Sequence, residues 1–458
     1  MAAGTLGEAM RVMHGQLLAG DSQAPWSGAA IDSRQVGGGE LFFALAGEQT
    51  DGHHFVGDAL SRGASAAVVQ RPVERPPSGG LIRIADVQSG LHALTRHVRR
   101  RVPEHLVAVT GSVGKTTTKE LLAAMLERRF RVARSPGNLN NLLGFPLSLL
   151  SVQEATQWMV AEMGMSTPGE LSQLSRLSRP DAVVFTNVRA VHLENFGSVR
   201  EIADAKGELL DGISANGLVI ANADDPEVMR LATRHTGRVV SFGISRNADH
   251  RARDIVAHPQ GGSRFVWSWS EGSRTVRLPL LGAHNVANFL AAAACASALG
   301  VDHEEIEAVA AKAVAAPGRG QLHEVAGAVI IDDSYNSNPT ALEAALESAR
   351  ALQGDRHWAV LGDMLELGEE SRSFHRRLGA AAAQHGFSPI IAVGEAARDL
   401  ADAAREHGVE VVWFASAAAA STALPSHPRA GDVILVKGSR GVGLEVVVRR
   451  LLAAGRSA

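Results

Sequence analysis

A glycine-rich turn followed by a lysine and two threonines occupies residues 110–117, in the order Thr-Gly-Ser-Val-Gly-Lys-Thr-Thr. The apolar stretch Leu106–Thr110 predicts a buried strand, and Lys119–Arg129 has a helical pattern. Strand, glycine loop and helix in this order form a phosphate cradle, because backbone N–H groups and the helix N-terminus face the anion. The cradle consists of Gly111, Ser112, Val113, Gly114, Lys115, Thr116 and Thr117.

The lysine of such a loop reaches the β- and γ-phosphates of a nucleoside triphosphate, and a following hydroxyl holds Mg²⁺. We assign these roles to Lys115 and to either Thr116 or Thr117. Val109 replaces the first glycine of the usual pattern, and the alternative is an ordinary glycine turn before a helix. The lysine–threonine pair after a strand favours the triphosphate site.

Two further side chains with metal-binding chemistry follow predicted strands. Glu162 ends the run Trp158–Glu162, and His192 follows the run Ala182–Asn187. Ligands bind at the carboxyl ends of strands in open α/β sheets, so both residues are candidate Mg²⁺ ligands. The alternatives are a carboxylate that caps a strand end and a structural histidine.

Lys206 lies at an unusual position in the predicted helix Val199–Ile213. Ile202, Lys206 and Leu209 share one face of this helix, which predicts that the amine points into the core. Burial lowers the pKa of a lysine, and a neutral amine can react with carbon dioxide to give a carbamate, an oxygen ligand for Mg²⁺. The alternative, which the residues by themselves favour, is a lysine whose amine extends from the edge of that face to water.

Other candidate ligand contacts lie later in the chain. Asn285 and Asn288 open a predicted helix, where their amides suit an adenine edge or cap the helix. Arg319, in a glycine-rich boundary, suits a phosphate. Asp333 follows a predicted strand and suits a ribose hydroxyl or a metal. Lys437 and Arg440 suit a carboxylate or phosphate, although a simple turn is the alternative.

The chain divides into three blocks, which we expect to be domains at residues 1–86, 87–317 and 318–458. Strands and helices alternate in each block, and the second block is typical of a doubly wound parallel sheet with an added hairpin. The third block predicts a second, Rossmann-like α/β sheet. The predicted strands are Leu41–Leu45, Ala66–Val69, Leu81–Ile84, Leu106–Thr110, Trp158–Glu162, Ala182–Asn187, Leu218–Asn222, Val239–Phe242, Arg264–Ser268, Thr275–Leu278, Val329–Asp332, Trp358–Leu361, Ile390–Val393, Val409–Phe414 and Val433–Val436.

Composition excludes several classes of protein. The 458 residues are 45% hydrophobic and 20% charged, with a net charge of −3 and a single cysteine, so no disulfide forms within the chain. The basic run Arg96–Arg101 is interpreted as a solvated helix face, and we expect no nucleic-acid partner. The longest apolar stretch, Val286–Leu299, is shorter than the ~20 residues of a membrane span. With no visible signal peptide, we expect a soluble, cytoplasmic monomer.

Together these residues resemble the Mur ligase family over nearly the whole chain. The loop at 110–117 is similar to the family's variant phosphate loop. The resemblance implies metal-binding roles for Glu162 and His192. It also implies that Lys206 is carbamylated, rather than extended to water as its residue pattern by itself favours. It implies that Asn285 and Asn288 contact adenine, Arg319 phosphate and Asp333 ribose. The cofactors it implies are ATP and Mg²⁺, and the fold is three α/β domains: UDP-binding, central ATP-binding and C-terminal Rossmann-like.

Several stretches resemble the branch of this family that adds D-alanyl-D-alanine to UDP-N-acetylmuramoyl-tripeptide through an acyl phosphate. They are residues 137–146, 332–339 and 361–368, while residues 32–34, 41–47 and 51–53 resemble a UDP-binding domain shared with a sister branch. This implies UDP-substrate contacts at Ser33, Arg34, Asn138 and Asn141, and peptide contacts at Tyr335, Asn336, Lys437 and Arg440. The alternatives are a sister ligase that adds another amino acid or acts on folate, and a non-enzymatic phosphate-loop switch protein.

Overall fold

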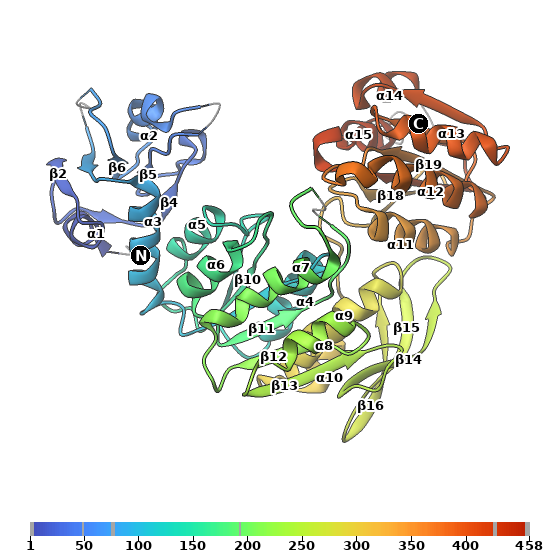
Figure 1. Cartoon of the computed structure of the whole chain (residues 1–458), viewed down its shortest axis with the longest axis horizontal. Helices are drawn as coiled ribbons and strands as arrows, with labels where there is room; N and C mark the ends of the chain where they lie inside the picture. The colour runs from blue at the N-terminus through green and yellow to red at the C-terminus, as the bar shows by residue number, and fades with distance from the viewer. Residues whose placement is uncertain (1–3, 48–49, 75–77, 192–193, 425–427, 454–458) are drawn as a thin grey trace.

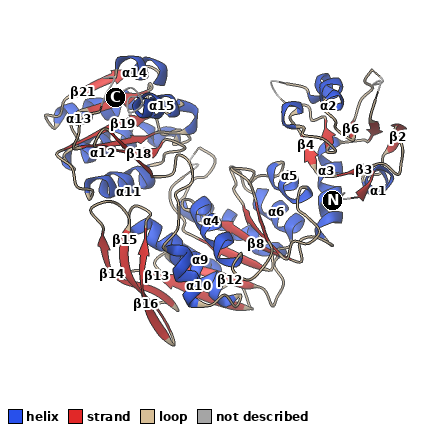
Figure 2. Ribbon diagram, turned by 180° about the vertical axis from the view of Figure 1, so that it is seen from behind, coloured by secondary structure: helices blue, strands red, loops and turns tan. Residues whose placement is uncertain are grey.

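The computed structural model describes residues 4–47, 50–74, 78–191, 194–424 and 428–453, which form three α/β lobes in chain order (Figure 1). The N-terminal and C-terminal lobes lie at opposite ends of the central one, as the view from behind confirms (Figure 2). Each lobe is built on its own larger sheet. The architecture is the predicted α/β fold with mostly parallel sheets.

The N-terminal lobe has a five-stranded sheet in the order β2-β7-β6-β5-β4, in which only β2 is antiparallel to its neighbour. A two-stranded sheet pairs β1 with β3. The elements are β1 (Gly4–Thr5), α1 (Leu6–Val12), β2 (Gln16–Ala19), β3 (Pro25–Trp26), β4 (Ala29–Ala30), η1 (Ser33–Gln35), β5 (Leu41–Phe43), η2 (Gly52–Phe55), α2 (Val56–Ser61), β6 (Ala66–Val69), β7 (Gly80–Arg83) and α3 (Val87–Arg99).

The central lobe has a nine-stranded sheet in the order β16-β15-β14-β13-β12-β11-β8-β10-β9. Strands β8 to β14 are parallel, and β14, β15 and β16 form an antiparallel arm. The strands are β8 (His105–Thr110), β9 (Val132–Arg134), β10 (Trp158–Glu162), β11 (Ala182–Phe185), β12 (Leu218–Asn222), β13 (Arg238–Gly243), β14 (His250–Ala257), β15 (Ser263–Trp269) and β16 (Gly272–Leu278). The sequence predicted the hairpin β15–β16 but not β9 or β14.

Helices cover both faces of this sheet, because both faces of β8 are apolar. Leu106 and Ala108 belong to one core and Val107 and Val109 to the other, as the alternation of strand side chains requires. On the first face lie α5 (Gly144–Leu150), α6 (Glu170–Ser178), α7 (Val199–Gly207), η3 (Glu208–Gly212) and α8 (Pro226–Ala232). On the second lie α4 (Lys115–Leu126), α9 (Ala283–Ala298) and α10 (His303–Ala310).

The C-terminal lobe has a six-stranded sheet in the order β17-β18-β22-β19-β20-β21, parallel except for the edge strand β17. The strands are β17 (Gln321–Val325), β18 (Ala328–Asp333), β19 (Arg356–Gly362), β20 (Ile390–Val393), β21 (Val411–Phe414) and β22 (Asp432–Lys437). One face packs against α11 (Pro339–Arg350), α12 (Ser371–Gln384) and α13 (Ala397–Glu406), and the other against α14 (Ala417–Ala423) and α15 (Glu445–Ala453). The short 3₁₀ helices are η4 (Gly368–Glu370) and η5 (Arg440–Val442).

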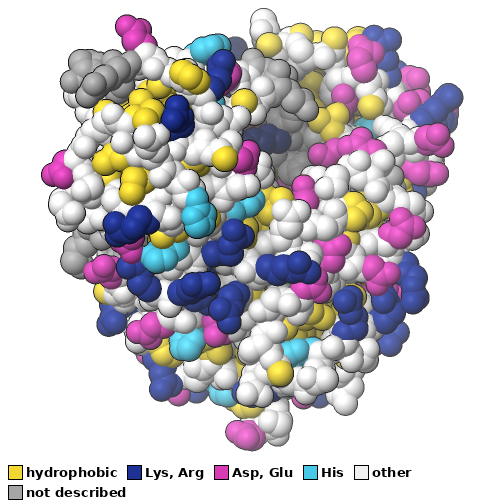
Figure 3. Space-filling model, turned by 60° about the vertical axis from the view of Figure 1, so that its left-hand side comes forward, with side chains coloured by type: hydrophobic (Ala, Val, Ile, Leu, Met, Phe, Trp, Pro, Cys, Tyr) yellow, Lys and Arg dark blue, Asp and Glu magenta, His cyan; other side chains and the backbone are white. Residues whose placement is uncertain are grey.

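Charges of both signs cover the surface. A band of Lys and Arg side chains crosses the face shown in Figure 3, with Asp and Glu side chains around it. The predicted solvated face at 96–101 holds for Arg96 and Arg100 but is wrong for Arg99, which is buried. Its guanidinium donates to the carbonyl oxygens of Ser178 (2.7 Å) and Pro103 (2.9 Å) and so ties α3 to the central lobe. No helix in the described part of the chain is long and apolar enough to cross a membrane.

Candidate active site

The glycine loop joins β8 to α4 as predicted, and its glycines are required by close packing. Gly111 and Gly114 have φ of +147° and +84°. A Cβ on Gly111 would lie 1.9 Å from the Thr186 hydroxyl, and one on Gly114 would lie 2.1 Å from Oδ1 of Asn288. The loop is therefore held between the end of β11 and helix α9, in a backbone conformation that other residues rarely adopt.

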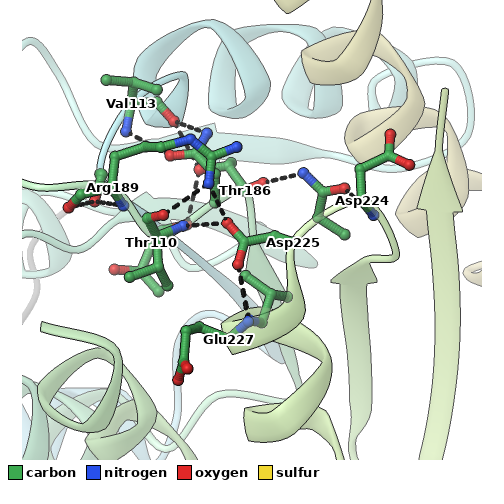
Figure 4. A network of polar contacts seen from close by, with 12 residues as sticks. Thr110, Val113, Thr186, Arg189, Asp224, Asp225 and Glu227 are labelled. Atoms are coloured by element: carbon green, nitrogen blue, oxygen red, sulfur yellow. Dashed lines mark hydrogen bonds and ion pairs between the residues drawn. The ribbon is translucent and has the colours of Figure 1, made fainter. Parts of the chain in front are cut away.

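The end of β11 fixes the loop through hydrogen bonds to Val113 (Figure 4). The Val113 carbonyl accepts from the Thr186 hydroxyl (2.7 Å) and the Asn187 amide (3.0 Å), and the Val113 N–H donates to Oδ1 of Asn187 (3.1 Å). The sequence did not identify these side chains as part of the site. Their position directly after a strand beside β8 is the signal that marks them.

An ion pair behind the loop extends this network (Figure 4). The Arg189 N–H donates to the Ser112 hydroxyl (2.9 Å), and its guanidinium lies 2.6 Å from the buried Asp225 carboxylate. Asp225 also accepts from the N–H groups of Val188 (2.8 Å) and Glu227 (3.0 Å), the second of which caps α8. Hydrogen bonds thus connect the phosphate loop to the end of β11 and to the start of α8, through side chains that the sequence did not identify.

Lys115 is the first residue of α4, and its ammonium lies over the loop. It donates to the carbonyl oxygens of Gly111 (2.9 Å) and Ser112 (3.3 Å). Burial lowers the pKa of Lys115, while the Glu162 carboxylate acts in the opposite direction and Arg319 adds to the lowering. A cation held at the start of a helix, where backbone N–H groups lack helical partners, is suited to an anion with several phosphate groups.

Glu162 lies beside the loop because β10 pairs with β8, with Glu162 opposite Val109. Its carboxylate is 4% exposed and accepts from the Thr116 hydroxyl (2.7 Å) and the Asn140 amide (2.9 Å). Hydroxyl and carboxylate oxygens are ligands that Mg²⁺ prefers, and Mg²⁺ usually takes only one or two carboxylates plus phosphate and water. The pair fits that ion, although the described residues contain no group of three His, Cys, Asp or Glu side chains that would hold a metal. The sequence missed Asn140.

Lys206 is buried as predicted, with 3% of its surface exposed, so its amine does not extend to water as the alternative required. Helix α7 ends at Gly207, however, and Leu209 lies in the 3₁₀ turn η3 rather than in one continuous helix. Burial lowers the pKa of Lys206 well below its usual value, and the charge of Lys115 adds to this. Within the described ranges no carboxylate pairs with its amine. His192 lies outside the described residues.

Neither asparagine of α9 caps that helix, and Asn288 faces α4. Asn285 donates to the Leu281 carbonyl (2.7 Å), and Asn288 donates to Oδ1 of Asn285 (2.9 Å). Thr118 on α4 lies 3.5 Å from Oδ1 of Asn288. No side chain caps the N-terminus of α9, so the capping alternative is wrong.

The candidate residues of the C-terminal lobe gather at the carboxyl ends of β18 and β22. Lys437 is buried, and its ammonium lies 2.6 Å from Asp333 and 2.9 Å from the Asn336 carbonyl. Arg440 donates to the Tyr335 hydroxyl (3.0 Å), and the Arg319 guanidinium lies 4.1 Å from the centre of that ring. Of the two expected cations, Lys437 is buried and paired with Asp333, whereas Arg440 is exposed to solvent.

The candidate UDP contacts lie near the junction of the first two lobes. A cavity of about 840 Å³ opens there, lined by the neighbouring residues Gln35 and Leu139 rather than by the candidates themselves. Arg34 is exposed and makes two bonds with Asp32 (2.9 and 2.8 Å), and Oδ1 of Asn141 accepts from the Gly144 N–H (2.8 Å) at the start of α5. Ser33 is buried and Asn138 is exposed.

Comparison with known proteins matches three family descriptions along the chain. The Mur ligase family catalytic domain matches residues 26–140, the Mur ligase middle domain residues 109–296, and the Mur ligase glutamate ligase domain residues 318–440. Two relatives are named UDP-N-acetylmuramoyl-tripeptide–D-alanyl-D-alanine ligase. The one from Bacillus subtilis is 34% identical over 93% of each chain, and the one from Escherichia coli is 36% identical over 98% of this chain and 99% of its own.

Solved structures agree with the sequence relatives. The crystal structure of MurF from Acinetobacter baumannii has a TM-score of 0.86 at 32% identity, with 98% of this chain and 99% of that chain covered. MurF ligase from Thermotoga maritima in complex with ADP has a TM-score of 0.80 at 28% identity and covers 94% and 98% of the two chains. The similarity therefore extends over all three lobes.

Proposed function

The chain belongs to the Mur ligase family, and from that premise we propose that it joins D-alanyl-D-alanine to UDP-N-acetylmuramoyl-tripeptide, with hydrolysis of ATP to ADP, in peptidoglycan synthesis. The observation that carries the proposal is the Thr116–Glu162 pair beside a braced phosphate loop, in a chain that matches ligases of this name over nearly its full length. Fold, loop and relatives thus support one activity.

The reaction has two steps. The terminal carboxylate of the tripeptide attacks the γ-phosphorus of ATP, the bond to the bridging oxygen breaks, and ADP leaves. The amine of the dipeptide then attacks the acyl carbon, the bond from carbon to the phosphate oxygen breaks, and phosphate leaves with one carboxylate oxygen. The amine loses its proton to solvent.

The residues of the central lobe act on the transferring phosphoryl group. The N–H groups at the start of α4 and the Lys115 ammonium would face the negative oxygens and stabilise them electrostatically, whereas the N–H groups of Ser112 and Val113 are bonded to Asn187. Thr116 and Glu162 would hold Mg²⁺, which would neutralise charge on the phosphates. We further propose that His192 and a carbamate on Lys206 would hold a second Mg²⁺, which would neutralise charge as the acyl phosphate forms.

We propose domains at residues 1–86, 87–317 and 318–458, each with its own substrate. The first holds the UDP end with Ser33, Arg34, Asn138 and Asn141. The second holds ATP, with Asn285 and Asn288 near adenine, and Arg319 and Asp333 complete the phosphate and ribose contacts. The third brings the dipeptide to Tyr335, Asn336, Lys437 and Arg440 and closes over the acyl phosphate. A cytoplasmic monomer without a nucleic-acid partner stays our prediction.

The proposal is tested by asking which amine acceptor supports phosphate release from ATP. Purified protein is given ATP, Mg²⁺ and UDP-N-acetylmuramoyl-tripeptide, and phosphate release is compared with D-alanyl-D-alanine, with single amino acids and with no acceptor. We expect release that depends on the tripeptide substrate and the dipeptide together. Release with a single amino acid instead would identify a sister ligase, and release without either substrate would identify a phosphate-loop switch protein.

A further inference from the structure

Lys119 is a fully buried cation that none of the steps above uses. It lies on α4, four residues after Lys115, with no exposed surface. Its ammonium donates to the Ser135 carbonyl (2.7 Å) and lies 2.9 Å from Oε1 of Glu120. Burying an ammonium is costly unless it is paired and hydrogen-bonded, so this arrangement points to a specific role.

The residue that Lys119 binds is itself bonded to Glu162. Ser135 directly follows β9, and its hydroxyl accepts from the Glu162 N–H (3.0 Å). The Ser135 N–H donates to the Val160 carbonyl (3.1 Å), so Ser135 continues the pairing of β9 with β10. One residue thus joins the Lys119 ammonium to the backbone of Glu162.

The chain that leaves Ser135 returns to the same carboxylate. Residues 136–139 lead to Asn140, whose amide donates to Oε1 of Glu162 (2.9 Å). The Asn140 carbonyl also accepts from the Gly164 N–H (2.9 Å) just after β10. Glu162 is therefore held at its backbone by Ser135 and at its carboxylate by Asn140, on a segment whose start is anchored by Lys119.

The charge of Lys119 is balanced within the same cluster. Oε2 of Glu120 lies 2.9 Å from Arg134, which also pairs with Glu127. Burial raises the pKa of Glu120, but hydrogen bonds from Arg134 and Lys119 outweigh it and hold the pKa below its usual value. The carboxylate is thus ionised, and the ammonium is fixed in one orientation toward Ser135.

We propose that Lys119 is a positioning residue for Glu162: it anchors Ser135 and so sets where the metal-binding carboxylate lies relative to Thr116. The proposal rests on the function proposed above, in which Glu162 holds Mg²⁺. Loss of hydrogen bonds that support a metal ligand commonly costs 10- to 100-fold in metal affinity or activity. Lys119 therefore acts on the metal-dependent part of nucleotide binding rather than on substrate binding.

The test compares Lys119→Met with Arg99→Met in the full chain. Both remove a buried cation that donates to backbone carbonyls, but Arg99 serves the junction with α3, away from the phosphate loop. Binding of ADP is measured by calorimetry with Mg²⁺ and again with EDTA. We expect Lys119→Met to weaken Mg²⁺·ADP binding about tenfold or more and metal-free ADP binding less than twofold, and Arg99→Met to change neither.

Two further variants keep the test decisive if Lys119→Met does not fold. Ser135→Ala keeps the carbonyl that Lys119 binds and removes the hydroxyl that Glu162 uses, so it should reproduce the metal-specific loss. Lys119→Arg, which restores a donor, should recover part of it. Equal losses with and without Mg²⁺ in the variants that fold would overturn the inference. The proposed function is tested separately, by measuring whether the unsubstituted protein forms the amide product.

Discussion

The substitution Gly114→Ala tests whether the glycine loop binds the triphosphate in the conformation seen here. With φ of +84°, alanine costs about 1–2 kcal/mol of backbone strain. Its Cβ would lie 2.1 Å from Oδ1 of Asn288, so that amide must move. Loss of its bonds to Asn285 (2.9 Å) and Thr118 (3.5 Å) costs about 0.5–1.5 kcal/mol each. The total cost of holding the loop in this conformation is about 2–5 kcal/mol.

The same lobe offers a matched control. Gly169 has a φ of +88° at the start of α6, and a Cβ there would meet nothing within 4 Å. Gly169→Ala therefore carries the backbone strain without the collision. Calorimetry should show Mg²⁺·ADP binding at least tenfold weaker in Gly114→Ala and unchanged in Gly169→Ala, since 1.4 kcal/mol is a tenfold change. Equal affinity of the two variants would refute the loop geometry.

Three further outcomes follow from the structure. Lys206→Ala should lose activity about 100-fold or more and recover part of it with acetate or formate but not chloride, because these anions replace the carbamate oxygens; full activity of the variant would refute the carbamate. Burial lowers the pKa of His250 to about 4, so the unfolded chain binds more protons at this residue as pH falls below about 6.5, and His250 alone should lower the free energy of unfolding by urea by about 2 kcal/mol between pH 7 and pH 5. His250→Gln, which keeps an acceptor for Trp267 without titrating, should reduce the stability difference between pH 7 and pH 5 by about that amount; an unchanged difference would contradict the assignment. Lys437→Met should destabilise the C-terminal lobe by about 3 kcal/mol in urea unfolding, because it leaves the Asp333 carboxylate without its partner, and the double variant with Asp333→Asn should recover part of the loss. Additive losses would show that the pair is not coupled.

The strands that the sequence predicted best are buried on both faces. Ala66–Val69, Leu218–Asn222 and Ile390–Val393 were predicted to the residue, because parallel strands under two helical layers are continuous apolar runs. The missed strands β14 and β17 are partly exposed and carry charged residues, so no apolar run marks them. A half-exposed antiparallel strand depends on its partner more than on its own composition.

The residues of the candidate site likewise divide into those that the sequence predicted and those that it did not. Glu162 and one of Thr116 and Thr117 were each predicted to bind Mg²⁺ because each follows or ends a predicted strand, and the Thr116 hydroxyl and the Glu162 carboxylate lie 2.7 Å apart. Asn140 could not be predicted, since its bond to Glu162 depends on the path of a loop after β9. The pairing of Asp333 with Lys437 depends on the register of β18 with β22, which no local pattern contains. Residue type at a strand end is readable from sequence, whereas partners brought together by loops and register are not.

The most direct test of the proposed reaction follows an oxygen atom. UDP-N-acetylmuramoyl-tripeptide labelled with ¹⁸O in its terminal carboxylate is incubated with the protein, ATP, Mg²⁺ and D-alanyl-D-alanine, and the products are analysed by mass spectrometry. We predict that each phosphate released carries one ¹⁸O atom. The peptide product should carry the added dipeptide and keep the other ¹⁸O atom in its new amide carbonyl. Phosphate that carries no ¹⁸O, or release of phosphate without the amide product, would contradict an ATP-dependent ligase that works through an acyl phosphate.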